Sequence, residues 1–324
     1  MSSSQRASIA VGSRTLSLSN LDKVLWPRDG FTKGDLIEYY RSVARVLVPH
    51  LKKIPLTLQR YPDGIDGPQF FEKQVPRGAP DWIDRVAVAT PGGRQRETTF
   101  PICSDEASLV YFANLAAIVL HVWTSHIPTL EEPDYVLFDL DPGERCTLRT
   151  LATVALGVRD LLQEIGLQPL VKTTGGFGVH VVVPLAAGYS YESAKIFAEI
   201  VARRAAGELG ERATLQRTIA KRPDDAVYID FVQVGMGKTI VPPYSVRARD
   251  GAPVSTPLHW EEVEAFSRRR GNALPADEFA KNTIRTVPGR LKREGDLWAG
   301  TAWKRQRLDK ASAAAARRWS VERG

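Results

Sequence analysis

The pattern of apolar and polar positions along the chain predicts alternating helices and strands. Apolar residues at helical spacing run through residues 32–50, and Thr32 is placed to cap this helix. A second helix is predicted over residues 104–122, with Ser104 as its cap. Between the two helices, residues 55–64 and 69–76 have the pattern of two strands joined by a turn. These elements indicate an N-terminal α/β module.

The second half of the chain has a more regular alternation. Helices are predicted between and after strands, with strands over residues 135–140, 170–174, 179–185 and 226–232 and helices over residues 148–165 and 191–209. This β-α-β-β-α-β order is that of a ferredoxin-like or RNA-recognition-type layer, so we expect an α+β fold. No linker separates the halves, and we expect the N-terminal module to pack on this layer as one folded unit.

The composition narrows the class of protein. The chain has 324 residues, of which 43% are hydrophobic and 25% charged, as in an ordinary globular protein. No apolar run approaches the roughly 20 residues that cross a bilayer, and the N-terminus lacks the apolar core of a signal peptide. We therefore expect a cytoplasmic protein without a membrane partner. Its two cysteines are too few for a disulfide framework.

The charge is concentrated at the C-terminal end. From Arg285 onward there are 11 Lys and Arg against 4 Asp and Glu, which equals the net charge of +7 for the whole chain. A basic segment of this kind suits contact with phosphates, although a solvated helical tail is an equal alternative. The rest of the chain is neutral, so any other nucleic-acid site must come from local clustering.

The strongest chemical signal is the pair Asp139 and Asp141 in the segment DYVLFDLDPGE. Side chains alternate along a strand, so both carboxylates point to one face while Leu140 points into the core. Adjacent carboxylates repel each other unless a cation lies between them, and hard oxygen ligands suit Mg²⁺ or Mn²⁺. Alternatively, Asp141 only starts the Asp-Pro-Gly turn. That alternative leaves Asp139 unexplained.

A third carboxylate, Asp230, lies in the segment AVYIDFVQ, where we expect it in the middle of a strand. An acid within such an apolar run is costly unless it faces a cation or solvent, so an exposed edge strand is the plainer alternative. Asp-x-Asp on one strand with a lone Asp on another is the layout of a two-metal phosphoryl-transfer site.

A glycine turn in KTTGGFGVHVVVPL lies between the two acidic strands. Gly175 and Gly178 let backbone amides approach phosphate oxygens, Thr174 adds a hydroxyl, and His180 can donate to a phosphate. A glycine turn alone is usually a plain hairpin, and a histidine in an apolar strand is usually a core residue. The position between the acidic strands is what favours a nucleotide site.

Together these three segments resemble motifs I, II and III of the archaeo-eukaryotic primase superfamily. A closer resemblance, in order over residues 15–290, is to the polymerase domain of bacterial ligase D. The segments that carry it are SNLDKVLWPRDGFTKGDLIEYY, RYPDG, FFEKQVP, DLDPGE and PYSVRARDGAPVSTPLHWEEV.

The resemblance implies a role for individual residues. It implies that the catalytic metal ligands are Asp139, Asp141 and Asp230. The implied nucleotide contacts are Thr174, Gly175, Gly178, His180, Gln233 and Arg247. A pocket for a DNA 5′-phosphate would comprise Asn20, Lys23 and Lys33, and template bases would stack on Phe70 and Phe71.

Three departures from the family pattern concern the nucleotide site. Phe177 stands where many members carry lysine, so Lys172 is a candidate substitute for that phosphate contact. The run before motif III is less basic than usual, which makes Arg222 a candidate nucleotide contact rather than a matched one. Motif III is followed by Gln233-Val234 instead of Gln-Asn or Arg-Asn.

The implied function is a template-directed polymerase with two divalent ions, Mn²⁺ or Mg²⁺, that prefers ribonucleotides over dNTPs. Its substrate would be gapped or broken DNA with a 5′-phosphate, in non-homologous end joining with Ku and a DNA ligase. We expect a monomeric, nucleoid-associated enzyme with a polymerase domain over residues 10–295, divided near residue 130, and a basic tail over residues 296–324. No Lys-x-Asp-Gly adenylation motif is present, so the chain itself carries no ligase activity.

Several alternatives stay open on sequence grounds. A stand-alone enzyme could fill gaps in excision repair, and a chain with a decayed site could only bind DNA ends. Asp-x-Asp also occurs in glycosyltransferases that use nucleotide sugars, which would need neither Asp230 nor the basic tail. A haloacid-dehalogenase-type phosphatase would carry Thr or Val where this chain has Gly143.

Overall fold

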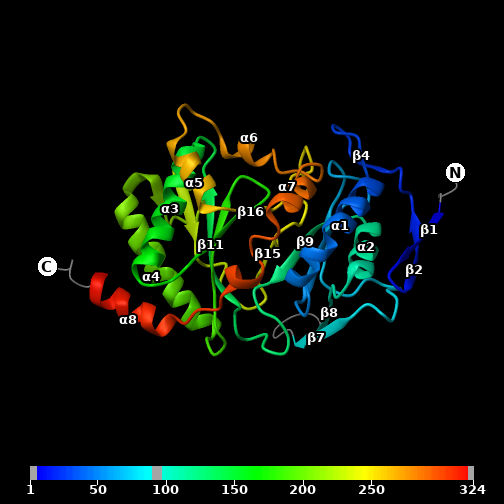
Figure 1. The fold of residues 1–324 in the computed structure, drawn as a ribbon, viewed down its shortest axis with the longest axis horizontal. Coiled ribbons are helices and arrows are strands. Elements are labelled where there is room, and N and C mark those ends of the chain that lie inside the picture. Colours follow the sequence, from blue (N-terminus) through cyan, green and yellow to red (C-terminus); the bar gives the residue numbers. More distant parts are fainter. Residues whose placement is uncertain (1–5, 90–96, 320–324) are drawn as a thin grey trace. The chain divides into compact units, whose positions relative to one another are not determined.

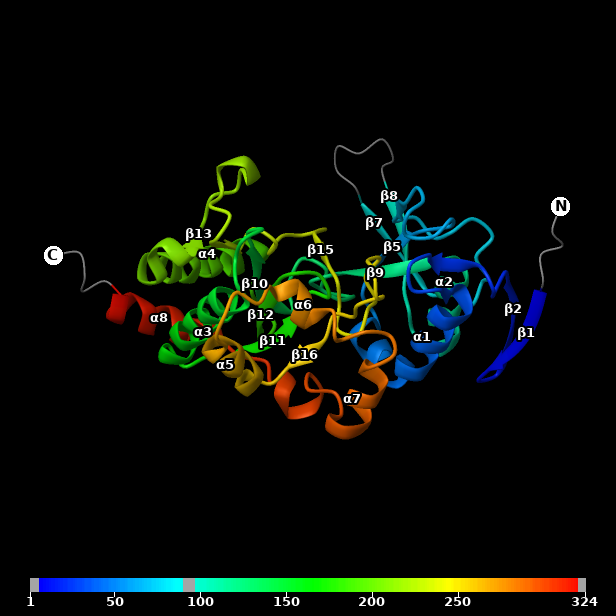
Figure 2. The ribbon, with the colours of Figure 1, turned by 90° about the horizontal axis from the view of Figure 1, so that it is seen from above.

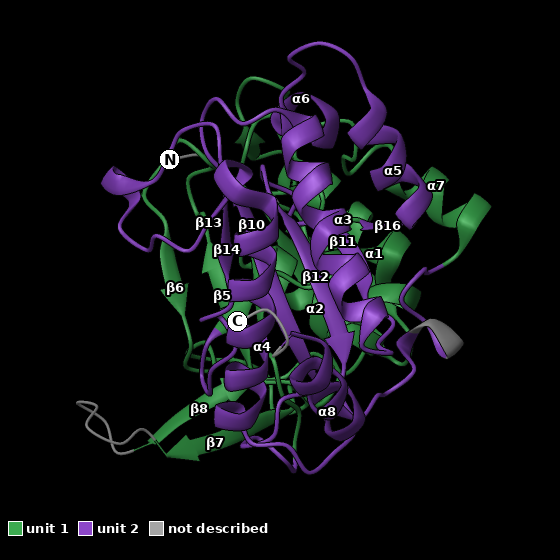
Figure 3. Cartoon of the chain, turned by 90° about the vertical axis from the view of Figure 1, so that its left-hand side faces the viewer, with its two compact units in different colours: residues 1–127, 239–256, 280–295 green, residues 128–238, 257–279, 296–324 purple. Residues whose placement is uncertain are grey.

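The computed structural model describes residues 6–89 and 97–319, except for the side chains of residues 301 and 302. The chain forms two compact units, each built from three segments (Figure 3). Unit 1 comprises residues 1–127, 239–256 and 280–295, and unit 2 comprises residues 128–238, 257–279 and 296–324. Each unit is therefore assembled from residues that lie far apart in the sequence. By these contacts, residues 239–256 and 280–295 pack with the N-terminal segment, although the sequence groups them with the catalytic core.

Unit 2 is built on a six-stranded sheet. In spatial order its strands are β13 (Ala213–Thr214), β14 (Val227–Asp230), β10 (Tyr135–Pro142), β12 (Val179–Pro184), β11 (Leu170–Thr173) and β16 (Pro257–Leu258). The four inner strands pair antiparallel with one another and lie in the order fourth, first, third, second along the chain. This is the ferredoxin-like arrangement that the sequence predicted, and the α+β class is confirmed.

Two long helices, α3 (Leu148–Glu164) and α4 (Tyr191–Leu209), cover one face of this sheet (Figures 1 and 3). Both begin at a predicted position because a hydroxyl side chain caps them. Thr147 Oγ1 accepts from the Thr150 amide at 3.1 Å, and Ser190 Oγ accepts from the Ser193 amide at 3.2 Å. The apolar positions of β10 and β12 that face these helices are fully buried. The opposite face is therefore the one available for polar side chains.

The remaining elements of unit 2 lie around this layer. They are α5 (Trp260–Arg268), α6 (Pro275–Phe279), α8 (Leu308–Trp319) and the short 3-10 turns η2 (Gly210–Arg212), η3 (Ile219–Lys221) and η4 (Gly300–Trp303). The basic C-terminal segment packs on the unit: Leu308, Ala311 and Ala315 of α8 are buried, and Arg318 lies 3.3 Å from Glu164 of α3.

Among the described residues, unit 1 contains a four-stranded sheet, three hairpins and three α-helices. Figure 2 shows most of these elements by label. The sheet order is β15 (Thr239–Ile240), β9 (Ala117–Trp123), β5 (Leu56–Arg60) and β6 (Phe70–Glu72). The hairpins pair β1 (Arg6–Val11) with β2 (Arg14–Ser19), β3 (Val24–Trp26) with β4 (Phe31–Thr32), and β7 (Arg85–Ala89) with β8 (Glu97–Pro101). The helices are α1 (Lys33–Leu47), followed by η1 (Val48–His50), α2 (Glu106–Asn114) and α7 (Val287–Glu294).

The first predicted helix is confirmed, and the second is only half right. Thr32 caps α1 in a reciprocal capping box with Asp35, as the sequence indicated. Helix α2, however, is capped by Asp105 rather than Ser104 and ends at Asn114. The apolar residues that follow form strand β9, because Ala116 takes a left-handed φ of 56° and ends the helical path.

Candidate functional site

The site is built on the face of the unit 2 sheet opposite α3 and α4, where β10 carries Asp139 and Asp141. The two residues lie on the same face of the strand, while Leu140 between them is fully buried on the helix-covered face. In the sheet register, Asp139 lies opposite Asp230 of β14 on one side and His180 of β12 on the other. Cβ atoms of such directly opposed residues are about 5 Å apart, so the three side chains are immediate neighbours.

A continuous polar row therefore crosses four strands: Asp230, Asp139, His180 and Lys172. His180 Nε2 lies 3.3 Å from Asp139 Oδ1, and the His180 side chain is buried. Lys172 is fully buried, and its Nζ donates to the Thr173 carbonyl at 3.3 Å. Two nitrogen groups thus lie beside two carboxylates on one sheet face. Such a row is suited to hold an anionic ligand next to a cation.

Asp230 is the last residue of β14 and not a mid-strand residue as the sequence predicted. The strand ends there because the next residues turn back toward the carboxylate. The Val232 amide donates to Asp230 Oδ1 at 2.7 Å, and Gln233 Nε2 donates to Oδ2 at 3.3 Å. Gln233, a predicted nucleotide contact, therefore touches the predicted metal ligand directly.

The glycine turn between β11 and β12 folds around the Thr174 hydroxyl. Thr174 Oγ1 accepts from the amides of Gly176 at 3.1 Å and Gly178 at 3.2 Å. Gly175 takes a φ of 70°, and a Cβ at Gly178 would come within 2.5 Å of the Leu140 carbonyl oxygen. The turn therefore needs glycine for two reasons, one conformational and one steric. The close approach places the turn directly against the strand that carries both aspartates.

Tyr228 is a residue of this face that the sequence did not single out. It lies opposite Asp141 in the register and two positions before Asp230 on β14. The Arg222 guanidinium lies 3.7 Å from the centre of its ring. Burial raises the pKa of Tyr228, as do the charges of Asp230 and Asp141, whereas Arg222 lowers it. The period-two rule applied backward from Asp230 would have indicated this tyrosine.

The donor set fits a hard divalent cation, because three carboxylates occupy adjacent positions on two neighbouring strands. Like charges in such positions destabilise a sheet unless a cation offsets them. The side chains do not converge on one point, however. Over residues 6–89 and 97–319, no group of three or more His, Cys, Asp or Glu side chains is arranged to hold a metal ion.

In unit 1, the residues predicted to bind a 5′-phosphate lie around the β3–β4 hairpin. The Lys23 amide donates to the Asn20 carbonyl at 3.1 Å, and the Lys33 amide donates to the Lys23 carbonyl at 2.8 Å. Lys33 is 5% exposed, and its Nζ donates to the Asn114 carbonyl at 3.1 Å. Burial, and then the charge of Lys23, lower the pKa of Lys33 to about 8. Lys23 Nζ also contacts Asp63 Oδ1 at 2.7 Å.

The predicted stacking residues, Phe70 and Phe71, are 44% and 54% exposed on the edge strand β6 of unit 1. As consecutive strand residues they point to opposite faces of the sheet, so one run of bases can stack on only one of them. The Arg60 guanidinium lies 5.2 Å from the centre of the Phe70 ring, and the ring centres of Phe71 and His121 are 5.4 Å apart.

His121, the neighbour of Phe71, is also influenced by Arg247. Burial, and then the positive charge of Arg247, lower the pKa of His121 to about 4, so this imidazole is neutral at pH 7. Arg247 belongs to unit 1, whereas the polar row belongs to unit 2. Its role at nucleotide phosphates therefore stays a prediction.

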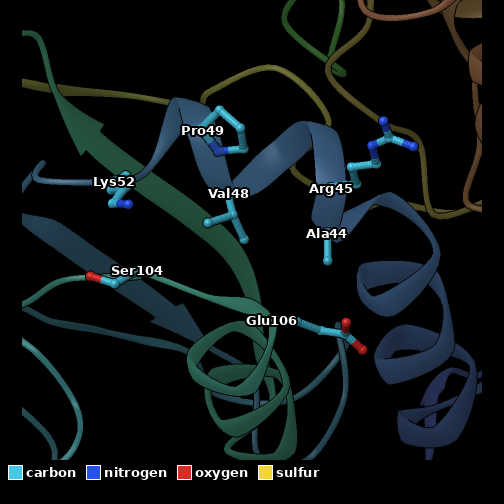
Figure 4. A pocket seen from close by; sticks show the side chains of 7 residues that line it. All are labelled: Ala44, Arg45, Val48, Pro49, Lys52, Ser104 and Glu106. Atoms are coloured by element: carbon cyan, nitrogen blue, oxygen red, sulfur yellow. The ribbon is translucent and has the colours of Figure 1, made fainter. Parts of the chain in front are cut away.

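Unit 1 also contains a hollow of about 540 Å³ between the end of α1 and the start of α2 (Figure 4). Its lining combines two cations, one acid, one hydroxyl and an apolar wall: Arg45, Lys52, Glu106, Ser104, Ala44, Val48 and Pro49. None of the predicted site residues lines it. In the part of the chain that the structure describes, no helix has the length and apolar character to cross a bilayer.

Comparison with known proteins gives consistent matches. The family described as LigD, primase-polymerase domain, matches residues 32–298. The chain is 36% identical over 294 residues to the multifunctional non-homologous end joining DNA repair protein LigD of Mycobacterium tuberculosis. It is 30% identical over 281 residues to the bifunctional non-homologous end joining protein LigD of Bacillus subtilis. These alignments cover 87% and 86% of this chain but only 36% and 43% of the two relatives.

A solved structure supports the same match. The polymerase domain from Mycobacterium tuberculosis ligase D, in complex with DNA, is similar to this chain with a TM-score of 0.78 and 35% sequence identity. The similarity covers 87% of this chain and 96% of that chain. Chain and solved domain therefore correspond over nearly their whole lengths, whereas the chain spans about two fifths or less of the curated relatives.

Proposed function

Because the chain belongs to the LigD primase-polymerase domain family, we propose that it is a template-directed nucleotidyltransferase that extends the 3′ hydroxyl of a DNA strand. The observation that carries this proposal is the position of Asp139, which lies between Asp230 and His180 and on the same strand face as Asp141. A phosphoryl-transfer site needs anionic oxygens for cations next to donors for phosphate, and this face offers both.

The three aspartates would hold two divalent ions, Mn²⁺ or Mg²⁺, which when bound supply Lewis-acid stabilisation of the charge that develops on the triphosphate. The protein contributes the orientation of these carboxylates. Gln233 and the Val232 amide hold Asp230, and His180 lies against Asp139. Asp230 and Asp139 therefore each have a neighbouring group that can fix the direction of the carboxylate.

The incoming nucleotide would bind along the polar row and the glycine turn. His180 and Lys172 supply donors next to the carboxylates, and Thr174 holds the turn in shape. Gly178 lets the turn lie against β10. The further nucleotide contacts we propose are Gly175, Gln233, Arg222 and Arg247. These groups bind and orient the triphosphate and leave the base to be chosen by the template.

The DNA end would be held by unit 1. Lys23 and Lys33 present two ammonium groups near each other beside Asn20, which suits a doubly charged 5′-phosphate. Phe71 or Phe70 offers an exposed ring for a template base. These groups would recognise the phosphorylated end of a strand independently of its base sequence.

We further propose a role in non-homologous end joining, because the relatives carry that pathway in their names. Ribonucleotide preference and the partners Ku and a DNA ligase are proposed as what the family resemblance implies. Gap filling in excision repair is the alternative setting, since the same site would serve a gapped duplex. In either setting the enzyme acts as a monomer in the cytoplasm, at the nucleoid.

Primer extension across a short gap tests the proposed function. We expect the chain to fill a gap flanked by a 5′-phosphate, faster with NTPs than with dNTPs, and to stop when EDTA removes the divalent ions. A chain that bound the gapped duplex but added no nucleotide with either metal would be an end-binding module and not a polymerase.

Lys33 gives a prediction about pH. Its pKa near 8 means that the ammonium is present at pH 7 and increasingly lost as the pH rises through 8, while the 5′-phosphate stays doubly charged. We therefore expect the preference for a 5′-phosphate over a 5′-hydroxyl to weaken by about tenfold between pH 7 and pH 9, the loss of one charged contact. Fluorescence anisotropy of labelled gapped DNA measures this preference.

Two variants separate this effect from general electrostatics. Lys33→Gln is expected to show the weaker preference at every pH, whereas Lys52→Gln, at an exposed lysine of the same unit, is expected to follow the wild type. A 5′-phosphate preference that stayed constant in the wild type from pH 7 to pH 9 would rule out Lys33 as the contact. Unfolding at high pH would not explain such a loss of preference. Neutralising a buried lysine stabilises the folded state, so deprotonation of Lys33 does not promote unfolding.

A further inference from the structure

Four side chains are neighbours on the sheet face that carries the proposed metal ligands, and only three of them are carboxylates. Strand β10 contributes Asp139 and Asp141, and β14 contributes Asp230 and Tyr228. Asp139 lies opposite Asp230, and Asp141 lies opposite Tyr228. The four side chains therefore form a two-by-two array on one sheet face, with a phenol next to Asp141 across the strands and next to Asp230 along the strand.

The ring of Tyr228 is held firmly in this position. The residue is 3% exposed, and the Arg222 guanidinium covers the ring at 3.7 Å from its centre. Arg222 is itself anchored, because its Nε donates to the Gln216 carbonyl at 2.8 Å and its Nη2 to the Arg217 carbonyl at 3.1 Å. A ring fixed on one side by the sheet and on the other by a tethered arginine leaves its hydroxyl little freedom to move.

Tyr228 differs chemically from the three aspartates next to it. A fourth carboxylate would add to the repulsion among three like charges, and an apolar residue would add no hydrogen-bond donor next to Asp141 and Asp230. A phenol is neutral and can donate a hydrogen bond to a carboxylate oxygen or to a water on a cation. The register places Tyr228 directly opposite Asp141 and two positions before Asp230, so both carboxylates are neighbours of this residue.

We propose that the Tyr228 hydroxyl is a positioning residue of the metal face, which orients the Asp141 and Asp230 carboxylates toward the divalent ions. The proposal deepens the proposed function and rests on it, because it takes the three aspartates as the ligands of those ions. Groups that orient metal ligands in this way typically change metal affinity by about tenfold or more when removed.

The test compares Mn²⁺ binding to wild type and Tyr228→Phe, without nucleotide or DNA. The phenylalanine keeps the ring under Arg222 and removes only the oxygen. Electron paramagnetic resonance of free Mn²⁺ gives the Kd, and we expect it to rise about tenfold in the variant. Primer extension should show the same shift in the Mn²⁺ concentration for half-maximal rate, with the rate largely restored at saturating Mn²⁺.

Tyr135→Phe is the matched control, because Tyr135 is a buried tyrosine on the same face of β10, six positions before Asp141. Its Mn²⁺ affinity is expected to equal that of the wild type. Tyr228→Phe with wild-type Mn²⁺ affinity, even with a lower Tm, would overturn the proposal and leave a packing role. A wild type that bound no Mn²⁺ would overturn it as well.

The role of Tyr228 and the polymerase function can be disproved separately. If the wild type extends primers but Tyr228→Phe binds Mn²⁺ as the wild type does, only the role of Tyr228 is lost. If the wild type extends nothing while Tyr228→Phe still weakens Mn²⁺ binding, the polymerase function is lost and the role of Tyr228 at a metal site stands.

Discussion

Asp139→Asn is expected to lower the rate of primer extension by about a thousandfold, equivalent to about 4 kcal/mol of transition-state stabilisation. Asp139 is the central member of the polar row, with Asp230 and His180 as its immediate neighbours. Asparagine keeps the shape of the side chain and removes its charge, so the loss would reflect weaker cation binding and not a changed fold. Single-turnover extension of a gapped duplex measures the rate.

The control for this substitution is Asp160→Asn, at an exposed aspartate on α3. This variant should extend at the wild-type rate, and both variants should bind gapped DNA and unfold at wild-type temperatures. Extension by Asp139→Asn at more than about a tenth of the wild-type rate would mean that the carboxylate row is not the catalytic centre.

Gly178→Ala is expected to lower the extension rate by about a hundredfold, because it displaces the strand that carries the aspartates. A Cβ at residue 178 would lie 2.5 Å from the Leu140 carbonyl oxygen, a distance that real Cβ atoms essentially never show. The contact is with backbone and cannot be relieved by a rotamer change. Since Leu140 lies between Asp139 and Asp141, any shift of its peptide moves both ligands.

Gly207→Ala provides the comparison, because a Cβ there meets nothing within 4 Å and the residue lies within α4. Alanine in a helix interior should stabilise the fold by about 0.5–1 kcal/mol without changing the rate. If Gly178→Ala kept both the wild-type rate and the wild-type Tm, the turn could not be held against β10 as tightly as the structure indicates.

Local patterns predicted the parts of the site that lie on one strand. Period-two alternation placed Asp139 and Asp141 on one face and Leu140 in the core, and the structure has them so. What alternation cannot supply is register. The position of Asp139 opposite His180 and Asp230 joins residues that are 41 and 91 positions apart in the sequence, and no local pattern relates them. The layout of an Asp-x-Asp strand, a lone Asp and a glycine turn suggested one site in advance, and the family resemblance supported it, but neither gives the register.

The errors have physical causes of the same kind. The helix predicted over residues 104–122 continued through an apolar run that proved to be β9, since periodicity alone does not separate a buried strand from a buried helix. No glycine or proline marks the break, which occurs at Ala116 in a left-handed conformation. Tyr228 was overlooked because a tyrosine in an apolar strand has the pattern of a core residue until the register places it beside Asp141.

The three-segment construction of unit 1 has a consequence for how the protein is made. Helix α7 packs against α1, and the Val254 amide donates to the Asn282 carbonyl, so the unit lacks part of its structure until about residue 295 has been synthesised. Unit 2 has the same dependence, because Gln306 pairs with Leu185. Most of the chain must therefore emerge from the ribosome before either unit can complete its fold. Such long-range pairing slows folding and leaves nascent β-strand edges exposed to aggregation, which favours protection by chaperones during translation.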